Sequence, residues 1–506
     1  MNASSGIRIA YMIGGVQLLL HVVTNGNYGV FRDELYYLDC ARHLAWGYVD
    51  HPPLSIALLA LTTTILGESV HAIRLFSELA GAVTVVLGAL LARELGGGRT
   101  AQIVAAFTAA VVPGALVLSG FFSMNAFDLV FWALLMWLLA RIVRTDDPRL
   151  WLWFGVVAGF GLLNKISVLF LGAGVAAGVV LTPLRRHLAL RQPYAGSLIA
   201  MAIASPYAFW NLANDWPTLE FMANAKQYKI AKMAPHEFIG EVALAMSPPM
   251  VLIWGAGLVW LLVPKWGGRF RALGFWFLAV TTLLIALKVK PYYLFPAFIV
   301  PLAAGGCAVE AFLKRWNKRW LAVVAFVWIG LSGLLTLPLA IPVLSPDGML
   351  AFQAKLGMGP GHYETNPVGA MPQYYSDRFG WENMTAVVAG VFENLDRDEQ
   401  ARTLILGSNY GEIGAINYYG PRWGLPTASG GHNNHYLWGP AVDDPLVVIH
   451  IGGSRERLEQ AFESVERAAT VTATYAMPYE SDLPVWVCRG GRVPMDDLWE
   501  AGKRFI

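Results

Sequence analysis

Residues 126–143 read AFDLVFWALLMWLLARIV, and only Asp128 and Arg141 interrupt their apolar character. About 17–25 such residues in a helix cross the roughly 30 Å of hydrocarbon in a bilayer. The whole composition agrees, because 56% of the 506 residues are apolar or aromatic and only 14% are charged. A typical soluble domain has about 25% charged residues. The sequence therefore predicts an α-helical protein that crosses a membrane several times.

The apolar pattern recurs along residues 1–340, whereas residues 341–506 have the composition of a soluble domain. By length and apolarity we expect about eleven crossings. They lie at 7–23, 70–92, 101–118, 126–143, 151–163, 166–183, 195–212, 243–263, 272–287, 292–313 and 320–340. The segment 54–66 is short and rich in threonine, so we expect it to lie at the surface or to dip into the membrane.

The charges of the loops predict an orientation. With the N-terminus in the cytoplasm, the loops that fall inside hold clusters of arginine and lysine, such as Arg141, Arg144 and Arg149. The opposite loops hold mainly Asp and Glu, as the positive-inside rule requires. An odd number of crossings then places residues 341–506 outside the cytoplasm, whereas one crossing more or fewer would place them inside.

Residues 341–506 predict an α/β domain. Thr403–Gly407 and Leu446–His450 have strand composition, and 455–469 has helical periodicity. Residues 407–414 contain three glycines without the spacing of a nucleotide-binding loop, so a strand, loop and helix is expected. Aromatic residues, among them Tyr410 and the stretch 432–438, form either the core of this domain or a cover over a site.

Several classes of function are excluded by the composition. The net charge is only +2, and no basic patch is interleaved with aromatic residues, so no nucleic-acid partner is expected. The three cysteines, Cys40, Cys307 and Cys488, have neither metal-ligand spacing nor the pattern of a disulfide framework.

The first outer loop contains the densest charge cluster, FRDELYYLD at 31–39. Ionisable residues beside a membrane span are costly and indicate function. Asp33 and Glu34 are therefore candidates for a general base, with Arg32 as a supporting residue. The alternative is a helix cap with a surface ion pair.

Two further acidic clusters fall on the same side. In Tyr48–Leu54 the paired prolines fix the direction of Asp50 and His51, unless they only end a helix. Asp128 begins the apolar helix that follows an outer link, where the helix dipole alone favours a carboxylate.

Cations also lie on this side, against the charge trend. Lys165 follows Asn164 between two spans, and Lys288 and Lys290 precede Tyr292. They either anchor the chain in headgroups and an aromatic belt or bind a phosphate. Acids able to deprotonate a hydroxyl and lysines able to hold a phosphate thus share one face, which suggests transfer chemistry on a lipid phosphate. A transporter or flippase is the rival, but it would place charges near the midplane and show an internal repeat.

The motifs resemble those of polyprenyl-phosphate-dependent glycosyltransferases of the GT-C fold, and within them the branch of protein mannosyltransferases and aminoarabinose transferases. They cover most of residues 1–300 in the expected order. They are Arg32-Asp-Glu-Leu-Tyr36, Asp50-His-Pro-Pro-Leu54, the Asp128 link, Asn164-Lys165 and Lys290-Pro-Tyr-Tyr-Leu-Phe-Pro296.

The resemblance implies roles for these residues. Asp33 corresponds to the base that deprotonates the acceptor hydroxyl, with Glu34 as the second member of the acidic pair and Asp128 as an acid near the donor phosphate. Lys165 and Lys290 correspond to phosphate-binding cations, and Lys288, Tyr292 and His51 are further candidates. His51 stands where the aminoarabinose branch has lysine, and histidine titrates near neutrality.

The implied reaction is a single displacement that inverts the sugar, from a polyprenyl-phosphate donor to a lipid, protein or polysaccharide acceptor. In the aminoarabinose branch the residue at Asp50 helps to hold zinc. No histidine partners can be assigned here, so no metal is predicted, although a divalent metal stays an open alternative. The resemblance also implies a multi-pass protein of the bacterial plasma (inner) membrane, with the domain at 341–506 in the periplasm.

Overall fold

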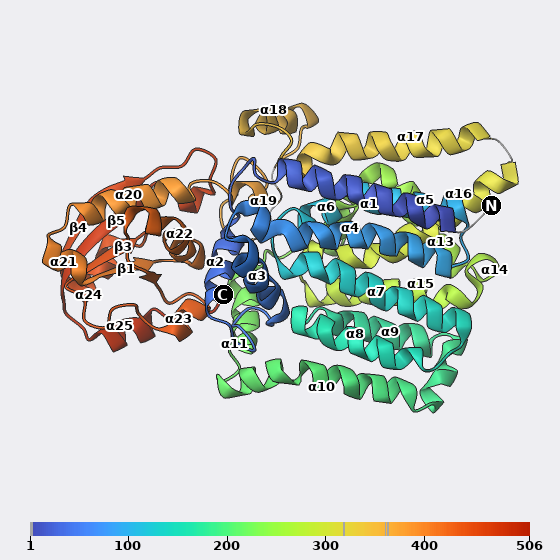
Figure 1. Cartoon of the computed structure of the whole chain (residues 1–506), viewed down its shortest axis with the longest axis horizontal. Helices are drawn as coiled ribbons and strands as arrows, with labels where there is room; N and C mark the ends of the chain where they lie inside the picture. Colours follow the sequence, from blue (N-terminus) through green and yellow to red (C-terminus); the bar gives the residue numbers. More distant parts are fainter. Residues whose placement is uncertain (1–3, 317–318, 360, 362–363) are drawn as a thin grey trace.

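A bundle of long helices forms one end of the molecule, and a small sheet covered by helices forms the other (Figure 1). The computed structural model describes residues 4–316, 319–359, 361 and 364–506. Three short helices, α2 (Arg32–Arg42), α3 (Leu54–Leu66) and α11 (Pro217–Asn224), lie at the end of the bundle that faces the sheet.

Six helical segments in the described part of the chain are long and apolar enough to cross a membrane. Three of them are single helices, and three include a short turn next to the main helix. They are α1 (Ser4–Thr24), α4 (Val70–Glu94), α7 (Met124–Thr145), and the segments around α15 (Arg271–Leu287), α16 (Ile299–Trp316) and α17 (Arg319–Thr336). The prediction of several membrane crossings is thereby confirmed.

Three more segments pass the same test only as bent pairs, which raises the number to nine. Pro113 breaks the first of these pairs, because a residue before proline is forced out of the helical region. The pairs are α5 (Arg99–Val111) with α6 (Pro113–Ser119), bent by 61°, α9 (Val168–Val180) with Pro183–Ala189, bent by 106°, and α12 (Pro235–Ala245) with the segment containing α13 (Val251–Leu262), bent by 94°. The count of eleven crossings stays a prediction.

The two remaining predicted spans are also helical, namely α8 (Leu150–Asn164) and α10 (Gln192–Ala213). They pack face to face where Gly155 meets Gly196, since a Cβ on Gly155 would lie 2.0 Å from the Gly196 carbonyl oxygen. Small residues allow such close backbone contact between apolar helices. The expected surface segment 54–66 is α3, which exposes Leu61, Ile65 and Leu66.

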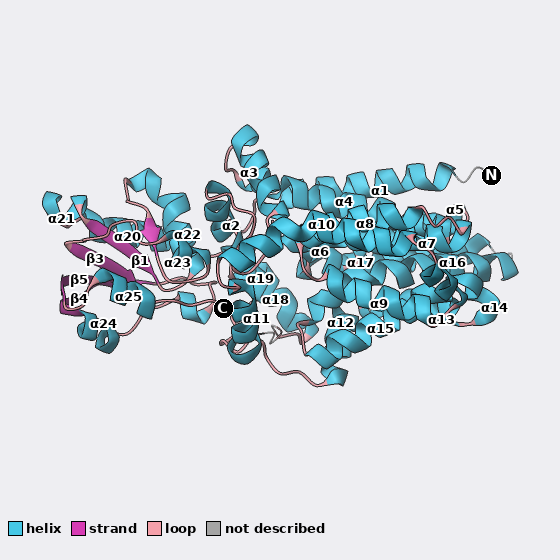
Figure 2. Cartoon of the chain, turned by 90° about the horizontal axis from the view of Figure 1, so that it is seen from below, coloured by secondary structure: helices cyan, strands magenta, loops and turns pink. Residues whose placement is uncertain are grey.

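The C-terminal end contains a five-stranded sheet in the order β2-β1-β3-β5-β4 (Figure 2). The first three of these strands are parallel, and β5 pairs antiparallel with β3 and β4. The strands are β1 (Thr403–Gly407), β2 (Ala428–Ser429), β3 (Val447–Ile451), β4 (Phe462–Val471) and β5 (Leu483–Gly491). The helices are α18 (Pro346–Leu356), α19 (Gln373–Ser376), α20 (Trp381–Glu393), α21 (Arg397–Ala401), α22 (Tyr410–Tyr419), α23 (Asn434–Trp438), α24 (Arg455–Ala461) and α25 (Met495–Ala501).

The sheet confirms the two expected strands and corrects one helix. The predicted helix at 455–469 ends at Ala461, and Phe462–Val471 is strand β4. The physical reason is tertiary, because β4 pairs along its length with β5 and buries Phe462, Val465 and Val471. Such pairing overrides a local helical pattern.

Helix α2 joins the two ends of the molecule. Its Leu35 lies in one core with Trp381 and Ile413 of the C-terminal part. A Cβ on Gly414 of α22 would lie 2.7 Å from the Leu35 backbone, so α22 lies directly against α2. Apart from Asp33, the cluster 31–39 is therefore buried between the bundle and the sheet.

Candidate active site

Helix α2 begins at the acidic cluster because Glu34 caps it. The Phe31 backbone amide donates to Glu34 Oε2 at 2.7 Å, and the first turn also contains Asp33. Acidic residues in a first helical turn are favoured by the helix dipole. The side chains of Glu34 and Asp33 leave the start of α2 in different directions, and they have different surroundings.

Glu34 lies in a dry ion pair with Arg74 of α4. Arg74 Nε and Nη2 donate to the two Glu34 oxygens at 2.8 and 2.7 Å, and both side chains are 0% exposed. The Phe122 amide donates to Glu34 as well, at 2.7 Å. Arg74 also bonds the carbonyls of Asn25 and Gly29, which end the first span. Glu34 and Arg74 thus join four segments, namely the start of α2, helix α4, the link at Phe122 and the residues after α1.

Asp33 has the opposite surroundings, since 29% of its side chain is exposed. The Tyr410 hydroxyl, from α22, donates to Asp33 Oδ1 at 2.9 Å. Arg32 Nε lies 3.7 Å from the same oxygen. Arg32 itself is held by the Tyr479 hydroxyl at 2.6 Å and by Asp377 at 3.5 Å. Asp33 is thus an accessible carboxylate that the C-terminal part orients.

Asp50 and His51 lie beside α2. The Tyr36 hydroxyl donates to Asp50 Oδ1 at 2.8 Å, and His51 Nε2 lies 3.8 Å from that oxygen. The His51 ring is buried among Tyr36, Tyr37 and Tyr48. Its Nδ1 is 3.1 Å from the Pro52 carbonyl. The loop with the two prolines therefore fixes both side chains, as its sequence suggests.

Asp128 and Lys165 form a buried cluster in the bundle. Lys165 Nζ lies 3.6 Å from Asp128 Oδ2 and donates to Asn125 Oδ1 at 2.7 Å. The Ser167 hydroxyl lies 2.8 Å from both Asp128 oxygens. The Lys165 ammonium also lies 4.2 Å from the centre of the Tyr293 ring and 5.3 Å from that of Tyr292.

Lys290 connects this cluster to the C-terminal part. Its ammonium bonds Glu364 at 2.6 Å, and Gln373 donates to the other Glu364 oxygen at 3.2 Å. Burial alone would raise the pKa of Glu364, but Lys290 and Lys229 hold it well below its usual range. Lys288 is exposed and ends α15 in a left-handed conformation.

The stretch 432–438, which the sequence left undecided, lies at the junction of the two parts. His435 Nε2 is 3.0 Å from Asp39 of α2, and Asn434 accepts the Val49 amide at 2.7 Å. His432 Nδ1 accepts the Tyr410 amide at 3.2 Å. This stretch therefore attaches the C-terminal part to α2 and to the loop at Val49, and it contacts Tyr410, which bonds Asp33.

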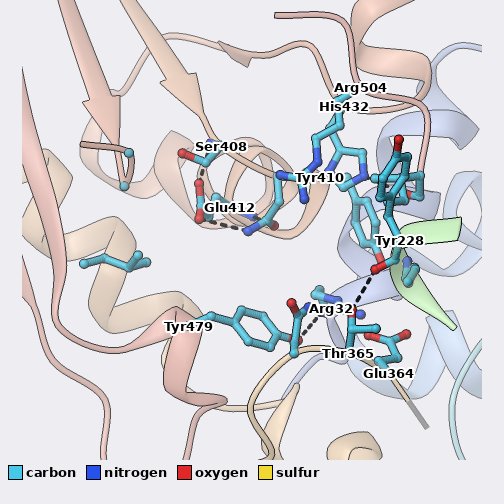
Figure 3. Close-up of a pocket in the computed structure, with 17 residues that line it drawn as sticks. Arg32, Tyr228, Glu364, Thr365, Ser408, Tyr410, Glu412, His432, Tyr479 and Arg504 are labelled. Carbon is cyan, nitrogen blue, oxygen red and sulfur yellow. Dashed lines mark hydrogen bonds between the residues drawn. The ribbon is translucent and has the colours of Figure 1, made fainter. Parts of the chain in front are cut away.

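A polar cavity of about 270 Å³ opens at this junction, with side chains from both parts facing it (Figure 3). It lies between α2, the segment before α12, residues 364–366 and the loops of the sheet. Its lining includes Arg32, Tyr228, Lys229, Glu364, Ser408, Tyr410, Glu412, His432, Tyr479 and Arg504. The membrane-face motifs include Arg32, and the aromatic residues singled out in the C-terminal part include Tyr410 and His432. The other lining residues come from segments that carry no such signal.

Two carboxyl groups are buried together beside this cavity. Asn409 Nδ2 donates to Glu412 Oε1 and to Glu480 Oε1, at 2.9 Å each. Burial raises the pKa of Glu480 to about 8, and burial together with Glu480 raises that of Glu412. Like charges this close disfavour double ionisation, so the pair keeps a proton at neutral pH.

Glu480→Gln is expected to change how stability depends on pH. Because folding raises the pKa of Glu480 from 4.5 to about 8, its proton favours the folded state at low pH, and this contribution is lost as pH rises across that interval. Relative to Glu480→Gln, the wild type should lose thermal stability in micelles between about pH 5 and about pH 8. Glu463→Gln, at an exposed position, serves as control. If the difference in thermal stability between the wild type and Glu480→Gln stays constant over this pH range, the raised pKa of Glu480 is contradicted.

The residues around Asp50 do not fit a metal. Within the described ranges no three side chains of His, Cys, Asp or Glu come together as a ligand set. The contacts of Asp50 are to Tyr36 and His51. We therefore assign no step of the reaction to a metal.

The arrangement of the helical bundle and the C-terminal part is that of a membrane protein with the GT-C fold. The profile of the dolichyl-phosphate-mannose-protein mannosyltransferase family matches residues 50–210. No curated protein sequence is significantly similar to the chain.

The similar solved structures are glycosyltransferases of this fold. ArnT from Cupriavidus metallidurans, bound to undecaprenyl phosphate, is 14% identical and matches 94% of this chain and 97% of its own, with a TM-score of 0.60. Its apo structure gives a TM-score of 0.61 at 14% identity, covering 96% of this chain and 98% of that one. The oligosaccharyltransferase AglB from Archaeoglobus fulgidus, in complex with an inhibitory peptide and a dolichol-phosphate, is 12% identical over 88% of this chain and 69% of its own, with a TM-score of 0.51. The resemblance indicated by the sequence motifs is thereby confirmed.

Proposed function

We propose that this chain is a membrane glycosyltransferase that moves a sugar from a polyprenyl-phosphate donor to an acceptor hydroxyl at the outer face of the plasma membrane. The observation that carries the proposal is the convergence at one end of the bundle. There Asp33 accepts a hydrogen bond from Tyr410 and Lys290 pairs with Glu364, and both partners belong to the C-terminal part. Lys165 lies 5.3 Å from the centre of the Tyr292 ring, close to Lys290 in the chain. The shared fold and the family profile support the same reaction class.

Asp33 acts as the general base. It takes the proton of the acceptor hydroxyl while that oxygen forms a bond to the anomeric carbon of the donor sugar. The bond from this carbon to the phosphate oxygen breaks at the same time, and polyprenyl phosphate leaves with the electron pair. One displacement inverts the anomeric centre. Tyr410 orients the Asp33 carboxylate. Arg32, which Asp377 holds in place, keeps a positive charge close to Asp33.

The leaving phosphate is stabilised by cations fixed in advance. Lys165 and Lys290 neutralise the charge that develops on the phosphate, with Tyr292 beside them and with His51 and Lys288 as outer contributors. Asp128 sets the position of Lys165. Glu34 and Asp50 serve as positioning residues, because Glu34 fixes α2 and Asp50 fixes Tyr36.

The proposed topology has the N-terminus in the cytoplasm, residues 1–340 as the transmembrane domain and residues 341–506 as a periplasmic domain. The far end of the bundle holds the basic clusters, such as Arg141 and Arg144 at the end of α7, and the positive-inside rule places this end in the cytoplasm. The active site then faces the outer leaflet.

Deletion of the gene tests the function as a whole. Mass spectrometry of envelope glycans and glycolipids should show the loss of one sugar modification. An unchanged glycan profile together with accumulation of a lipid-linked substrate on one side of the membrane would instead indicate a transporter or flippase.

Lys165→Met is expected to lower kcat/KM for the donor by roughly 10- to 100-fold, since a hydrogen bond to a charged group contributes about 1.5–3 kcal/mol. The double variant Asp128→Asn/Lys165→Met avoids leaving a buried carboxylate without its partner and should show the same loss. Transfer from a radiolabelled polyprenyl-phosphate sugar in micelles measures it. Lys226→Met, on an exposed side chain of the same face, is the control. Equal rates for Lys165→Met and this control would remove Lys165 from the site.

A further inference from the structure

The cavity at the junction is lined by two cations that have no ion pair among the described residues, Lys229 and Arg504. Arg32 also lines it, but Arg32 is already paired with Asp33 and Asp377. Two acids, Glu364 and Glu412, line the cavity as well. Glu364 is neutralised by Lys290 at 2.6 Å. Glu412 accepts the Ser408 amide at 2.5 Å, and its carboxyl and that of Glu480 both bond Asn409. Because the pKa of Glu412 is raised, Glu412 and Glu480 together do not contribute two negative charges to the cavity. The lining therefore favours an anion.

Lys229 forms no ion pair of its own among the described residues, although its charge, with that of Lys290, acts on Glu364. In the described ranges, no acceptor lies within hydrogen-bond distance of its ammonium and no carboxylate within 4.0 Å. The ammonium lies 5.8 Å from the centre of the Tyr410 ring. Burial lowers the pKa of Lys229, which expresses the cost of this position. A half-buried ammonium of this kind is stabilised by a bound anion.

The cavity shares a wall with the candidate base. Tyr410 lines the cavity and donates to Asp33, and Arg32 lines it and lies 3.7 Å from Asp33. A group seated in the cavity is thus separated from the base by one side chain. The volume of about 270 Å³ lies at the lower end of small-molecule pockets, which is room for one substituted sugar ring rather than an extended chain.

The rest of the lining suits a sugar. The rings of Tyr228, Tyr410 and Tyr479 provide flat faces, and the polar side chains Thr365, Asn366, Ser408 and Asn409 provide donors and acceptors. Figure 3 shows Tyr228, Tyr410 and Tyr479 around the same space, from three different segments of the chain.

We propose that this cavity binds the anionic substituent of an acidic glycan acceptor, a phosphate or a carboxylate, on Lys229 and Arg32 with Arg504 at the edge. This assignment rests on the proposed function, since it makes the neighbouring hydroxyl of that acceptor the group that Asp33 deprotonates. It names the acceptor class as a phosphorylated or uronic sugar unit, displayed at the outer face.

Binding to the full chain in detergent micelles tests the proposal without relying on transfer. Glucose 6-phosphate, glucuronate and glucose are the probes, followed by saturation-transfer NMR. We expect both acidic sugars to bind and glucose to bind at least tenfold more weakly. Lys229→Met should weaken the acidic sugars at least tenfold, Lys229→Arg should retain them, and Lys226→Met should leave them unchanged. Equal binding of glucose, or no effect of Lys229→Met, would overturn the proposal.

A competition arm identifies the source of the anion. Undecaprenyl phosphate should still bind to Lys229→Met as it does to the wild type and should not displace glucose 6-phosphate. If it displaces this sugar and also requires Lys229, the cavity belongs to the donor phosphate and the acceptor assignment is wrong. Phosphoserine that binds as tightly as glucose 6-phosphate would likewise overturn the glycan assignment. Because binding is measured directly, the two proposals can fail separately. Failure of the transferase proposal appears in the transfer assay, whereas failure of the acceptor proposal appears in the binding of the acidic sugars.

Discussion

Asp33→Asn should fold, insert in the membrane and bind donor, yet lose sugar transfer by about 10²- to 10⁴-fold, the usual contribution of a positioned base. The amide keeps the shape of the carboxylate and can still accept the Tyr410 hydroxyl, which lies 2.9 Å away. It cannot accept the proton of the acceptor hydroxyl. Transfer from a polyprenyl-phosphate sugar by purified protein measures kcat, and KM for the donor should change little.

The matched control is Glu68→Gln. Glu68 is an acid on the same face, 38% exposed, and its partner Arg42 is 2.7 Å away. This variant should transfer sugar at the wild-type rate. Near-normal transfer by Asp33→Asn would remove Asp33 from the role of base, whereas an unfolded Asp33→Asn would be recognised from its thermal unfolding in micelles.

Arg74→Met should destabilise the protein by about 3–5 kcal/mol, because it leaves Glu34 charged and without its partner in a dry interior. Both side chains of this pair are 0% exposed. Arg74 also bonds the carbonyls of Asn25 and Gly29, so the end of the first span and the start of α2 should loosen together. The midpoint of thermal unfolding in micelles, and the yield of folded protein, measure the effect.

Two variants separate this pair from ordinary ion pairing. Arg455→Met breaks a contact of the same length, 2.7 Å to Glu459, between side chains that are 60% and 50% exposed, and it should cost only about 0–1 kcal/mol. Arg74→Met/Glu34→Gln removes both charges and should recover part of the loss. If Arg74→Met costs no more than Arg455→Met, the buried pair is not what holds α2 in place.

The candidate site was predictable where the signal is local. A charged residue next to an apolar run is visible in the sequence, and Asp33, Asp128, Lys165 and Lys290 all meet that description. The residues alone did not separate Asp33 from Glu34, because adjacent residues share their neighbours in the chain, and only the family resemblance singled out Asp33 as the base. Their environments differ only through Arg74 and Tyr410, which approach from different segments.

The cavity lining was not predictable for the same reason. Lys229, Glu364 and Tyr479 lie in polar segments where charged and aromatic residues are ordinary, so nothing in the pattern marks them. Glu364 gains its role only by meeting Lys290, 74 residues away in the chain. Strand β4 shows the same limit for the fold, since its pairing with β5 replaced an expected helical segment.

By itself, the sequence determined that the chain has several helices long and apolar enough to cross a membrane, and it predicted that the polar residues gather on one face. Both follow from contiguous residues, since apolar length decides whether a helix can cross a bilayer and loop charge indicates its direction. Only the tertiary structure decided which carboxylate is accessible, which is locked in an ion pair, and which side chains close the cavity. These properties depend on surfaces that meet across long stretches of chain, as Tyr410 and Asp33 do over 377 residues.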